Sequence, residues 1–435
     1  MKAFAMRKWG RAGLVAAAAL ALGTAADVAV ANPTANPVTL TVWDWSSPAP
    51  NVMKQVDDAF TKANPGIVIK RVHQPFNSYF TLLRTAVATR KGPDVFENYA
   101  SPLLFDYYAG LTSLAKYRTP EQKKDLLGWS YVSSSLSPNG TPYAMPWTGQ
   151  GIHFYYNKAL FKKAGLDPNT PPKTWAQFLA ACDKLKAAGI TPINAGWKDG
   201  YLGEWWVDVL SANYMTPAEL VASGAKPNWK SPAITKAFGL LQQLVDKGYM
   251  TKNAEAIPLF PDAINNFGAG KAAFMVGLAA NNANWSEFSK DAIGKDLGAM
   301  LPPLAPNSLM KQQQFDYGPA LSWSITKWSK NPDAAYKYFS FLATPAAQVM
   351  TYNGAGSFPN NSRAKVSTTN PVGNEILGWV RTKKTYVGQV TLIRANVEAA
   401  FDKVVPQVLT KQLSLSSALS QIQDAQDKSA PIPTH

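Results

Sequence analysis

The sequence predicts an α/β protein with two lobes, each with its own hydrophobic core. In the first quarter of the chain, short runs rich in β-branched residues alternate with segments whose apolar residues have helical spacing. Such alternation predicts a mainly parallel, doubly wound sheet. A chain of 435 residues is too long for one ordinary core and has the length for two. Apolar residues make up 46% of it, which is near the globular norm and argues against disorder.

Residues 1–31 are expected to form a secretory signal peptide that does not belong to the fold. Basic residues precede the apolar run 14–22, and Ala-Val-Ala at 29–31 offers a small-x-small cleavage site. The apolar run is too short to span a membrane. The only cysteine, Cys182, is far from this site, so no cysteine that could carry a lipid follows the signal. We therefore expect export to the periplasm without a lipid anchor.

Polar and aromatic residues follow the three strands predicted near the start of the chain. The predicted strands are Val38–Trp43, Ile67–Val72 and Asp94–Glu97. In open parallel sheets, ligands bind beyond the carboxyl ends of the strands. The residues expected there are Trp45 and Ser47 after the first strand, His73 and Gln74 after the second, and Asn98 after the third.

The middle of the chain carries two helix-start signals. A strand over 151–156 is expected to lead into a short helix that Asn157 caps. Thr174 and Gln177 have the spacing of a capping box for a second helix. Cys182 falls on the apolar stripe of this second helix, so we predict a buried structural thiol there.

Strands and helices are expected to continue through the second half of the chain. Helices are predicted to begin near Glu204, Ile234, Pro332 and Pro345, and strands to lie at 272–276, 297–304 and 318–325. The C-terminal helices are expected to be interrupted at Pro406 and to end in a polar tail from Lys428.

Several motifs, taken in order, resemble one known family. They are TLTVWDW, KANPGIVIK, KGPDVFENY, YYNKALFKKAGL, PPKTW, LKAAGITPI, FGAGKAAFMV and NPDAAYKYFSFLATPAAQVM. Together they resemble the family 1 extracellular solute-binding proteins, the sugar receptors of ABC importers, which include the maltodextrin-binding proteins. The resemblance covers nearly the whole chain after the signal peptide.

The resemblance implies a periplasmic-binding-protein fold, with two α/β lobes joined by a multi-strand, type II-like hinge. Lobe 1 is then expected at 38–147 plus 303–343, and lobe 2 at 148–302 plus 344–427, with a flexible tail at 428–435. The chain is expected to cross between lobes near Trp147, Pro302 and Ala343. Three crossings permit closure without shearing either core.

The sequence argues against metal or nucleophilic catalysis and predicts no cofactor. His73 and His153 lie far apart, no clustered cysteine or Gly-x-Ser-x-Gly motif occurs, and the glycines at 268–270 lack Walker spacing. Paired carboxylates of a glycosidase remain an alternative, because they pair in space. Asp199, Glu204 and Asp208 are the candidates, and binding of sugar hydroxyls explains them equally well.

Aromatic residues beside planar polar ones predict a carbohydrate site. Aromatic rings cover the apolar faces of a sugar, while Asp, Asn and Gln bind adjacent hydroxyls. The groupings are Trp45, Asn98 with Tyr99, Trp147 with Gln150, Trp197 with Asp199 and Tyr201, and Asn281 with Trp285.

The resemblance adds roles to some of these residues. Asp199 and Tyr201 are similar to the acidic-x-aromatic group with which maltodextrin-binding proteins hold a sugar. Trp45 and Ser47 match the loop after the first strand, Asn98 and Ser101 the loop after the third, and Gln150 a carboxylate position near the hinge. Ser101 and Gln150 replace acidic residues. In the family, a tryptophan that stacks on the sugar often follows the strand that corresponds to 272–276. The matching position in this sequence lies near Ala280, and Trp285 comes later in the chain.

We therefore predict the substrate-binding component of an ABC importer, a monomer that delivers a mono- or oligosaccharide to permease subunits in the inner membrane. The alternatives are a receptor for a polyol or glycerophosphodiester, and a secreted glycan-processing enzyme. The net charge of the whole sequence is +15, and removal of the predicted signal peptide leaves 39 basic and 27 acidic residues, or +12. This charge could attract nucleic acid or an acidic membrane surface, but lysine and arginine are dispersed, so a solvated basic surface is expected instead.

Overall fold

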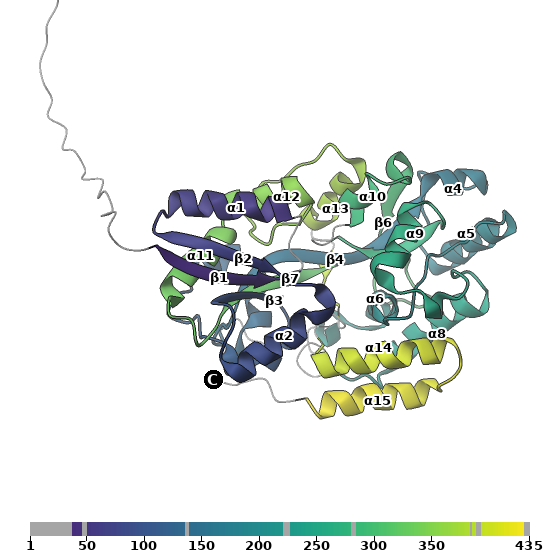
Figure 1. Ribbon diagram of the computed structural model, residues 1–435. Helices are drawn as coiled ribbons and strands as arrows, with labels where there is room; N and C mark the ends of the chain where they lie inside the picture. The colour runs from purple at the N-terminus through teal and green to yellow at the C-terminus, as the bar shows by residue number, and fades with distance from the viewer. Residues whose placement is uncertain are drawn as a thin grey trace, which may run out of the picture. The chain divides into compact units, whose positions relative to one another are not determined.

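A computed structural model describes residues 37–45, 50–134, 139–220, 227–279, 284–382, 385–388 and 393–429 (Figure 1). The predicted signal peptide and the candidate residues Ser47 and Asn281 lie outside this part of the chain, as do residues 430–435 of the predicted tail.

Three parallel strands open the fold, as predicted. They are β1 (Val38–Asp44), β2 (Ile67–His73) and β3 (Val95–Tyr99), and β1 pairs with both of the others. Helix α1 (Pro50–Ala63) connects β1 to β2, and α2 (Phe76–Thr89) connects β2 to β3. The βαβ connections place the carboxyl ends of the three strands at one edge of the sheet.

Apart from one short parallel strand, the rest of the sheet is antiparallel, so the prediction of a mainly parallel sheet is wrong beyond the first three strands. The long strands β4 (Met145–Asn157) and β7 (Phe315–Ile325) run antiparallel to each other, and β7 also pairs antiparallel with β3. β5 (Phe274–Leu278) and β6 (Leu297–Met300) pair antiparallel with β4, while β8 (Thr385–Tyr386) pairs parallel with β7. The alternation of strand and helix on which the prediction rested does not extend to these returning strands.

Two hydrophobic cores share this sheet. The first is formed by residues between Leu40 and Trp147 and between Ala320 and Ala347. The second is formed by residues between Ile152 and Tyr317 and between Tyr352 and Ile422. The chain therefore passes from one core to the other inside β4, inside β7 and inside α12 (Pro345–Ala355), which gives two α/β lobes.

The remaining described helices pack on the sheet or on one another. They are η1 (Pro102–Gly110), α3 (Pro120–Asp125), η2 (Trp129–Val132), α4 (Lys158–Lys163), α5 (Trp175–Ala187), α6 (Tyr201–Ser211), η4 (Ala212–Tyr214), α8 (Pro232–Asp246), η5 (Ala254–Ala256), η6 (Leu259–Ala263), α9 (Ile264–Gly268), α10 (Asn284–Phe288), η7 (Gly294–Asp296), α11 (Pro332–Leu342), α13 (Pro371–Arg381), α14 (Ala395–Leu409) and α15 (Leu415–Asp427). Figure 1 shows α14 alongside α15. None of the helices in the described ranges is long and apolar enough to cross a membrane.

Pro406 does not interrupt the C-terminal helices, which corrects the prediction. It lies inside α14, three residues before Leu409 ends the helix. Proline removes one N–H donor and costs most in the middle of a helix. Here the buried residues Val404, Val405 and Val408 hold this last turn against the second core.

The predicted capping box at the start of α5 is confirmed. The N–H of Gln177 donates to Thr174 Oγ1 at 3.3 Å, and the N–H of Thr174 donates to Gln177 Oε1 at 3.2 Å. α5 then buries Phe178 and Cys182 completely, which confirms the predicted buried thiol.

Replacing Thr174 by alanine is expected to lower the free energy of unfolding by about 1 kcal/mol, because one amide at the start of α5 loses its acceptor. Urea unfolding followed by circular dichroism measures the change. Thr174→Ser keeps the hydroxyl and is the control. An equal loss in both variants would show that the methyl group, rather than the cap, stabilises the helix.

Candidate functional site

In the first lobe, aromatic side chains gather at the carboxyl ends of the strands. The ring of Trp45 lies 4.6 Å from that of Tyr79, 4.9 Å from that of Phe80 and 5.2 Å from that of Tyr99 (centroid distances). Phe80 stacks on Tyr99 at 5.5 Å. Trp45 is only 6% exposed, whereas Tyr99 is half-buried. The packed aromatic rings therefore hold Tyr99 in place at this edge.

Two of the predicted residues on this edge make contacts that stabilise β1 and β2. His73 Nδ1 lies 2.7 Å from Asp44 Oδ1, and Asp44 is fully buried and also pairs with Arg71. The N–H of Gln74 donates to the carbonyl of Asp44 at 2.8 Å. The imidazole of His73 remains half exposed. Contact of His73 or Gln74 with a solute stays a prediction.

Asn98 and Ser101 support the loop after β3. Asn98 is fully buried, and its Oδ1 accepts from the N–H of Tyr99 at 2.8 Å. Its Nδ2 has no hydrogen-bond partner among the described residues. Ser101 Oγ accepts from the N–H of Leu103 and caps η1. The Asn98 amide therefore keeps a donor that the described residues do not use.

The structure places three predicted tryptophans inside the hydrophobic cores. Trp147 is 1% exposed and lies against Trp323, with ring centroids 5.2 Å apart. Trp197 is 3% exposed in the second core. Trp285 is 6% exposed, and its Nε1 donates to the carbonyl of Gly356 at 3.3 Å. These rings have little surface with which to stack on a ligand in this conformation.

Gln150 is half-buried in β4, where it pairs in register with Gly318. Gln150 lies on the stretch of β4 that joins the two cores. Its position is thus consistent with the hinge location that the sequence predicts, and its contact with a solute stays a prediction.

In the second lobe, Asp199 and Tyr201 lie on either side of a tight turn. Gly200 adopts a positive φ of 78°, and its N–H donates to the carbonyl of Trp197 at 3.0 Å. Asp199 Oδ2 accepts from the N–H of Leu259 at 2.8 Å. Tyr201 is half-buried and begins α6. The turn thus fixes the aromatic side chain at the start of a helix.

Glycines bring α14 close to α6. A Cβ on Gly200 would lie 2.2 Å from the Cα of Asp402, and one on Gly203 would lie 2.2 Å from Val405 Cγ1. Neither position therefore has space for a larger residue unless α14 moves. This contact brings carboxyl groups on α14 next to those on α6.

We name the resulting group the tyrosine–carboxylate cluster; it comprises Tyr99, Tyr201, Glu204, Glu398 and Asp402. Tyr99 comes from the first lobe and the other four from the second. Burial is the largest cause that raises the pKa of both tyrosine hydroxyls, and the negative charge of Glu398 is the second. Glu204 is 4% exposed, and the other four residues are half-buried. Residues from both lobes therefore meet at the cluster.

The carboxyl groups of the cluster hold their protons more tightly than ordinary carboxyls. Burial, with Asp106 as a second cause, raises the pKa of Glu398 to about 7. Burial and the neighbouring Glu398 raise the pKa of Asp402 to about 8. Burial and Asp402 raise the pKa of Glu204 well above its ordinary value. The cluster therefore presents both proton donors and acceptors near neutral pH.

An ion pair beside the cluster joins the lobes. Arg394 Nε donates to Asp106 Oδ1 at 2.7 Å, and the N–H of Ala395 donates to Asp106 Oδ2 at 3.1 Å. Asp106 lies on η1, whose apolar side chains belong to the first core, whereas α14 packs in the second. Arg394 is 5% exposed. The pair ties the start of α14 to the first lobe.

Sequence reasoning missed Phe80, Arg394, Glu398 and Asp402 as site residues. It considered Glu204 either as a catalytic carboxylate or as a group that binds sugar hydroxyls. The available signal was weak: Glu398 and Asp402 lie four residues apart and so share a face of one of the predicted C-terminal helices. Nothing in the sequence shows that this face meets α6.

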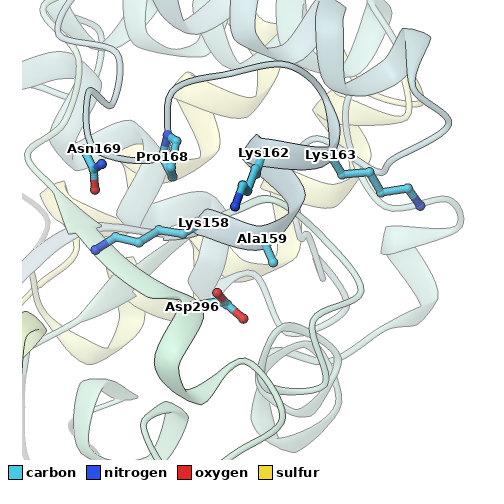
Figure 2. A pocket seen from close by; sticks show the side chains of 7 residues that line it. All are labelled: Lys158, Ala159, Lys162, Lys163, Pro168, Asn169 and Asp296. Atoms are coloured by element: carbon cyan, nitrogen blue, oxygen red, sulfur yellow. The ribbon is translucent and has the colours of Figure 1, made fainter.

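The structure also has a basic cavity of about 510 Å³ outside the cluster (Figure 2). It is lined by Lys158, Ala159, Lys162, Lys163, Pro168, Asn169 and Asp296. None of the predicted site residues lines it.

Within the described ranges, no three or more His, Cys, Asp or Glu side chains are grouped so that they could hold a metal ion.

Residues 55–372 match the family described as bacterial extracellular solute-binding protein. The chain belongs to this family. The resemblance identified from the motifs is thus confirmed. The family and the relatives of this solute-binding protein are named as binding proteins rather than as enzymes.

The solute-binding protein has relatives over most of its length. It is 26% identical over 367 residues to a putative binding protein of Brucella abortus (strain 2308), covering 83% of this chain and 84% of that one. It is 24% identical over 417 residues to the sn-glycerol-3-phosphate-binding periplasmic protein of Salmonella paratyphi A, covering 86% and 90%. A solved chitin oligosaccharide binding protein superposes with a TM-score of 0.77 at 21% identity, covering 91% and 99%. The predicted fold is confirmed.

Proposed function

We propose that this solute-binding protein captures a mono- or oligosaccharide between its lobes and delivers it to the permease of an ABC importer. The observation that carries the proposal is that burial, and after it Glu398, raises the pKa of both Tyr99 in one lobe and Tyr201 in the other, while Arg394 and Asp106 tie the start of α14, which carries Glu398, to the first lobe. Aromatic rings cover the apolar faces of a sugar, and carboxyl groups bind its hydroxyls. Solved relatives named for chitin oligosaccharide, raffinose and maltose support a sugar.

A ligand that contacts both lobes binds the closed arrangement more tightly than the open one and therefore favours closure. No chemistry on the ligand is required. We keep two lobes with three crossings, but the two cores favour placing the second crossing between Tyr317 and Ala320 instead of near Pro302. We further propose that the protein acts in the periplasm as a monomer without a lipid anchor or a nucleic-acid partner.

A glycerophosphate ligand is the second candidate, because a relative is named for sn-glycerol-3-phosphate. The cluster disfavours it. A phosphate would lie next to Glu204, Glu398 and Asp402, which repel an anion whenever they are ionised. The nearby guanidinium of Arg394 is engaged by Asp106. A neutral polyhydroxyl ligand has no such penalty.

A thermal-shift screen with calorimetry on the hits tests the proposal. The probes are chitin oligosaccharides, maltose, raffinose, polyols and sn-glycerol-3-phosphate. We expect a neutral sugar to raise the melting temperature and to be recovered intact, because the ligand binds only the folded form. Binding of sn-glycerol-3-phosphate without any sugar would establish the second candidate. Release of cleaved sugar would contradict a purely binding role.

A further inference from the structure

A network of buried charged and polar side chains in the first lobe ends at His73, at the carboxyl end of β2. His73 is the last residue of its strand and pairs in register with Asp44, the last residue of β1. His73 Nδ1 lies 2.7 Å from Asp44 Oδ1. The Asp44 side chain is fully buried, whereas 47% of the His73 side chain is exposed. One ring nitrogen of His73 therefore meets a buried carboxyl group, while about half of the side chain stays accessible.

Two helices hold the Asp44 carboxyl group in place through Arg71. Arg71 Nη1 donates to Asp44 Oδ2, and Arg71 Nε and Nη2 donate to the two oxygens of Asp57 at 2.8 and 3.0 Å. The hydroxyl of Tyr338 donates to Asp57 Oδ1 at 2.6 Å. Asp57 lies on α1, which packs on β2, and Tyr338 lies on α11, which packs on β1 (Figure 1). Both helices therefore fix the orientation of Asp44.

The contacts of Asp44 decide which ring nitrogen of His73 carries a hydrogen. A guanidinium group can only donate hydrogen bonds, and a carboxylate can only accept them. Asp44 Oδ2 accepts from Arg71, so Oδ1 acts as an acceptor toward His73. Nδ1 of His73 therefore carries the hydrogen. In a neutral imidazole the other nitrogen, Nε2, then has a free lone pair.

The Nε2 atom of His73 is available at the edge of the sheet where the proposed solute site lies. Within the described part of the chain, no hydrogen bond involves Nε2. The N–H of Gln74 donates to the carbonyl of Asp44 at 2.8 Å, which joins the ends of β1 and β2. Trp45, the next residue after Asp44, packs against Tyr99 of the tyrosine–carboxylate cluster at 5.2 Å. His73 thus ends its strand at the same edge as Tyr99.

We propose that Asp44 fixes His73 as a hydrogen-bond acceptor for a hydroxyl group of the solute. His73 Nε2 accepts from the solute, and Asp44 is a positioning residue that acts only through the imidazole. This inference rests on the proposed function for the identity of the solute. It adds a requirement for specificity. The solute must bring a hydroxyl hydrogen to this edge, which a sugar does and an ionised phosphate oxygen does not.

Nitrogen-15 NMR of the intact protein, labelled on histidine, tests the tautomer directly, because protonated and unprotonated ring nitrogens have distinct chemical shifts. The sequence has three histidines, and His73→Ala identifies the signals of His73. At about pH 8, above the ordinary histidine pKa of about 6.5, we expect hydrogen on Nδ1 and none on Nε2. Hydrogen on Nε2 alone would overturn the proposal. Hydrogen on both nitrogens would also overturn it, because His73 would then be a second cation beside Asp44 and Asp57.

The variant Asp44→Asn is expected to reverse the tautomer. Arg71 can only donate, so it keeps the amide oxygen, and the amide NH2 then faces His73 Nδ1. Nδ1 becomes an acceptor, and the hydrogen moves to Nε2. Lower stability with an unchanged tautomer would show that Asp44 only stabilises the lobe, and would overturn its positioning role. If Asp44→Asn does not fold, the tautomer of the unaltered protein still decides the inference.

Titration with chitin oligosaccharide, maltose and raffinose tests the contact with the solute. When a sugar binds, we expect the Nε2 signal of His73 to move toward that of a protonated nitrogen. His73→Ala should weaken binding about fivefold, the effect of one neutral hydrogen bond. Lys70→Ala removes an exposed side chain from the same strand and should keep full affinity.

The outcomes separate this inference from the proposed function. Sugar binding that leaves the Nε2 signal of His73 unchanged overturns the inference and keeps the proposed function. If none of the three sugars binds, the proposed function fails, and the tautomer of His73 still decides whether Asp44 fixes it as an acceptor.

Discussion

Sugar binding is expected to weaken at least about tenfold, or about 1.4 kcal/mol, when Tyr201 is replaced by alanine. The side chain of Tyr201 is half-buried, and burial, followed by Glu398 and then Tyr99 of the first lobe, raises the pKa of its hydroxyl. Its loss removes an aromatic surface for the sugar, whereas the buried residues Leu202 and Trp206 still hold α6 in the second core. Isothermal titration calorimetry measures the affinity, and thermal unfolding should change little.

Three further variants make this result specific. Tyr99→Ala should weaken binding from the other lobe by a similar factor. Tyr201→Phe keeps the ring and separates stacking from hydroxyl contacts. Tyr214→Ala removes a half-buried tyrosine outside the cluster and should leave the affinity unchanged. Full affinity in both Tyr99→Ala and Tyr201→Ala would remove the cluster from the solute site.

Replacing Arg394 by alanine is expected to lower the free energy of unfolding by about 3 kcal/mol, because removal of one partner leaves the other charge of a mostly buried pair uncompensated. The Arg394 side chain is 6% exposed and that of Asp106 is 22% exposed. The unpaired Asp106 carboxylate would then lie near Glu398, whose pKa it already raises. Urea unfolding monitored by tryptophan fluorescence measures the change.

Lys54→Ala is the control for this prediction. Lys54 pairs with an aspartate, Asp58, at 2.7 Å on α1, but the two side chains are 73% and 64% exposed. Exposed pairs contribute about 1 kcal/mol or less. A double-mutant cycle with Asp106→Asn isolates the coupling between the two partners of the inter-lobe pair. If Arg394→Ala costs no more than Lys54→Ala, the pair does not hold α14 to the first lobe.

Much of the fold could be predicted because its signals are local. The capping box of Thr174 and Gln177, the cap of Asn157 on α4 and the alternation of β1, α1 and β2 each depend on residues that are neighbours in the chain. The pairing of β4 with β7 could not be predicted in the same way. Met145 pairs with Trp323 across a large separation in sequence, and antiparallel register between such distant strands is set by tertiary packing.

The candidate site shows the same division. Sequence alone selected Asp199 and Tyr201, and it placed Trp45, His73 and Asn98 at the carboxyl ends of the first three strands, because strand order and turn residues are local properties. It could not distinguish a buried tryptophan from one that stacks on a sugar. The same side chain suits both environments, and burial of Trp147, Trp197 and Trp285 depends on the surrounding elements.

By itself, the sequence determined the family, the two-lobe α/β fold and the acidic-x-aromatic turn at Asp199 and Tyr201. Only the tertiary structure decided that α14 meets α6, and so that Glu398 and Asp402 join Glu204 and the two tyrosines. The physical reason is that charge–charge repulsion and desolvation act through space. Carboxyl groups some 200 residues apart in the chain perturb one another only after folding has placed them in contact.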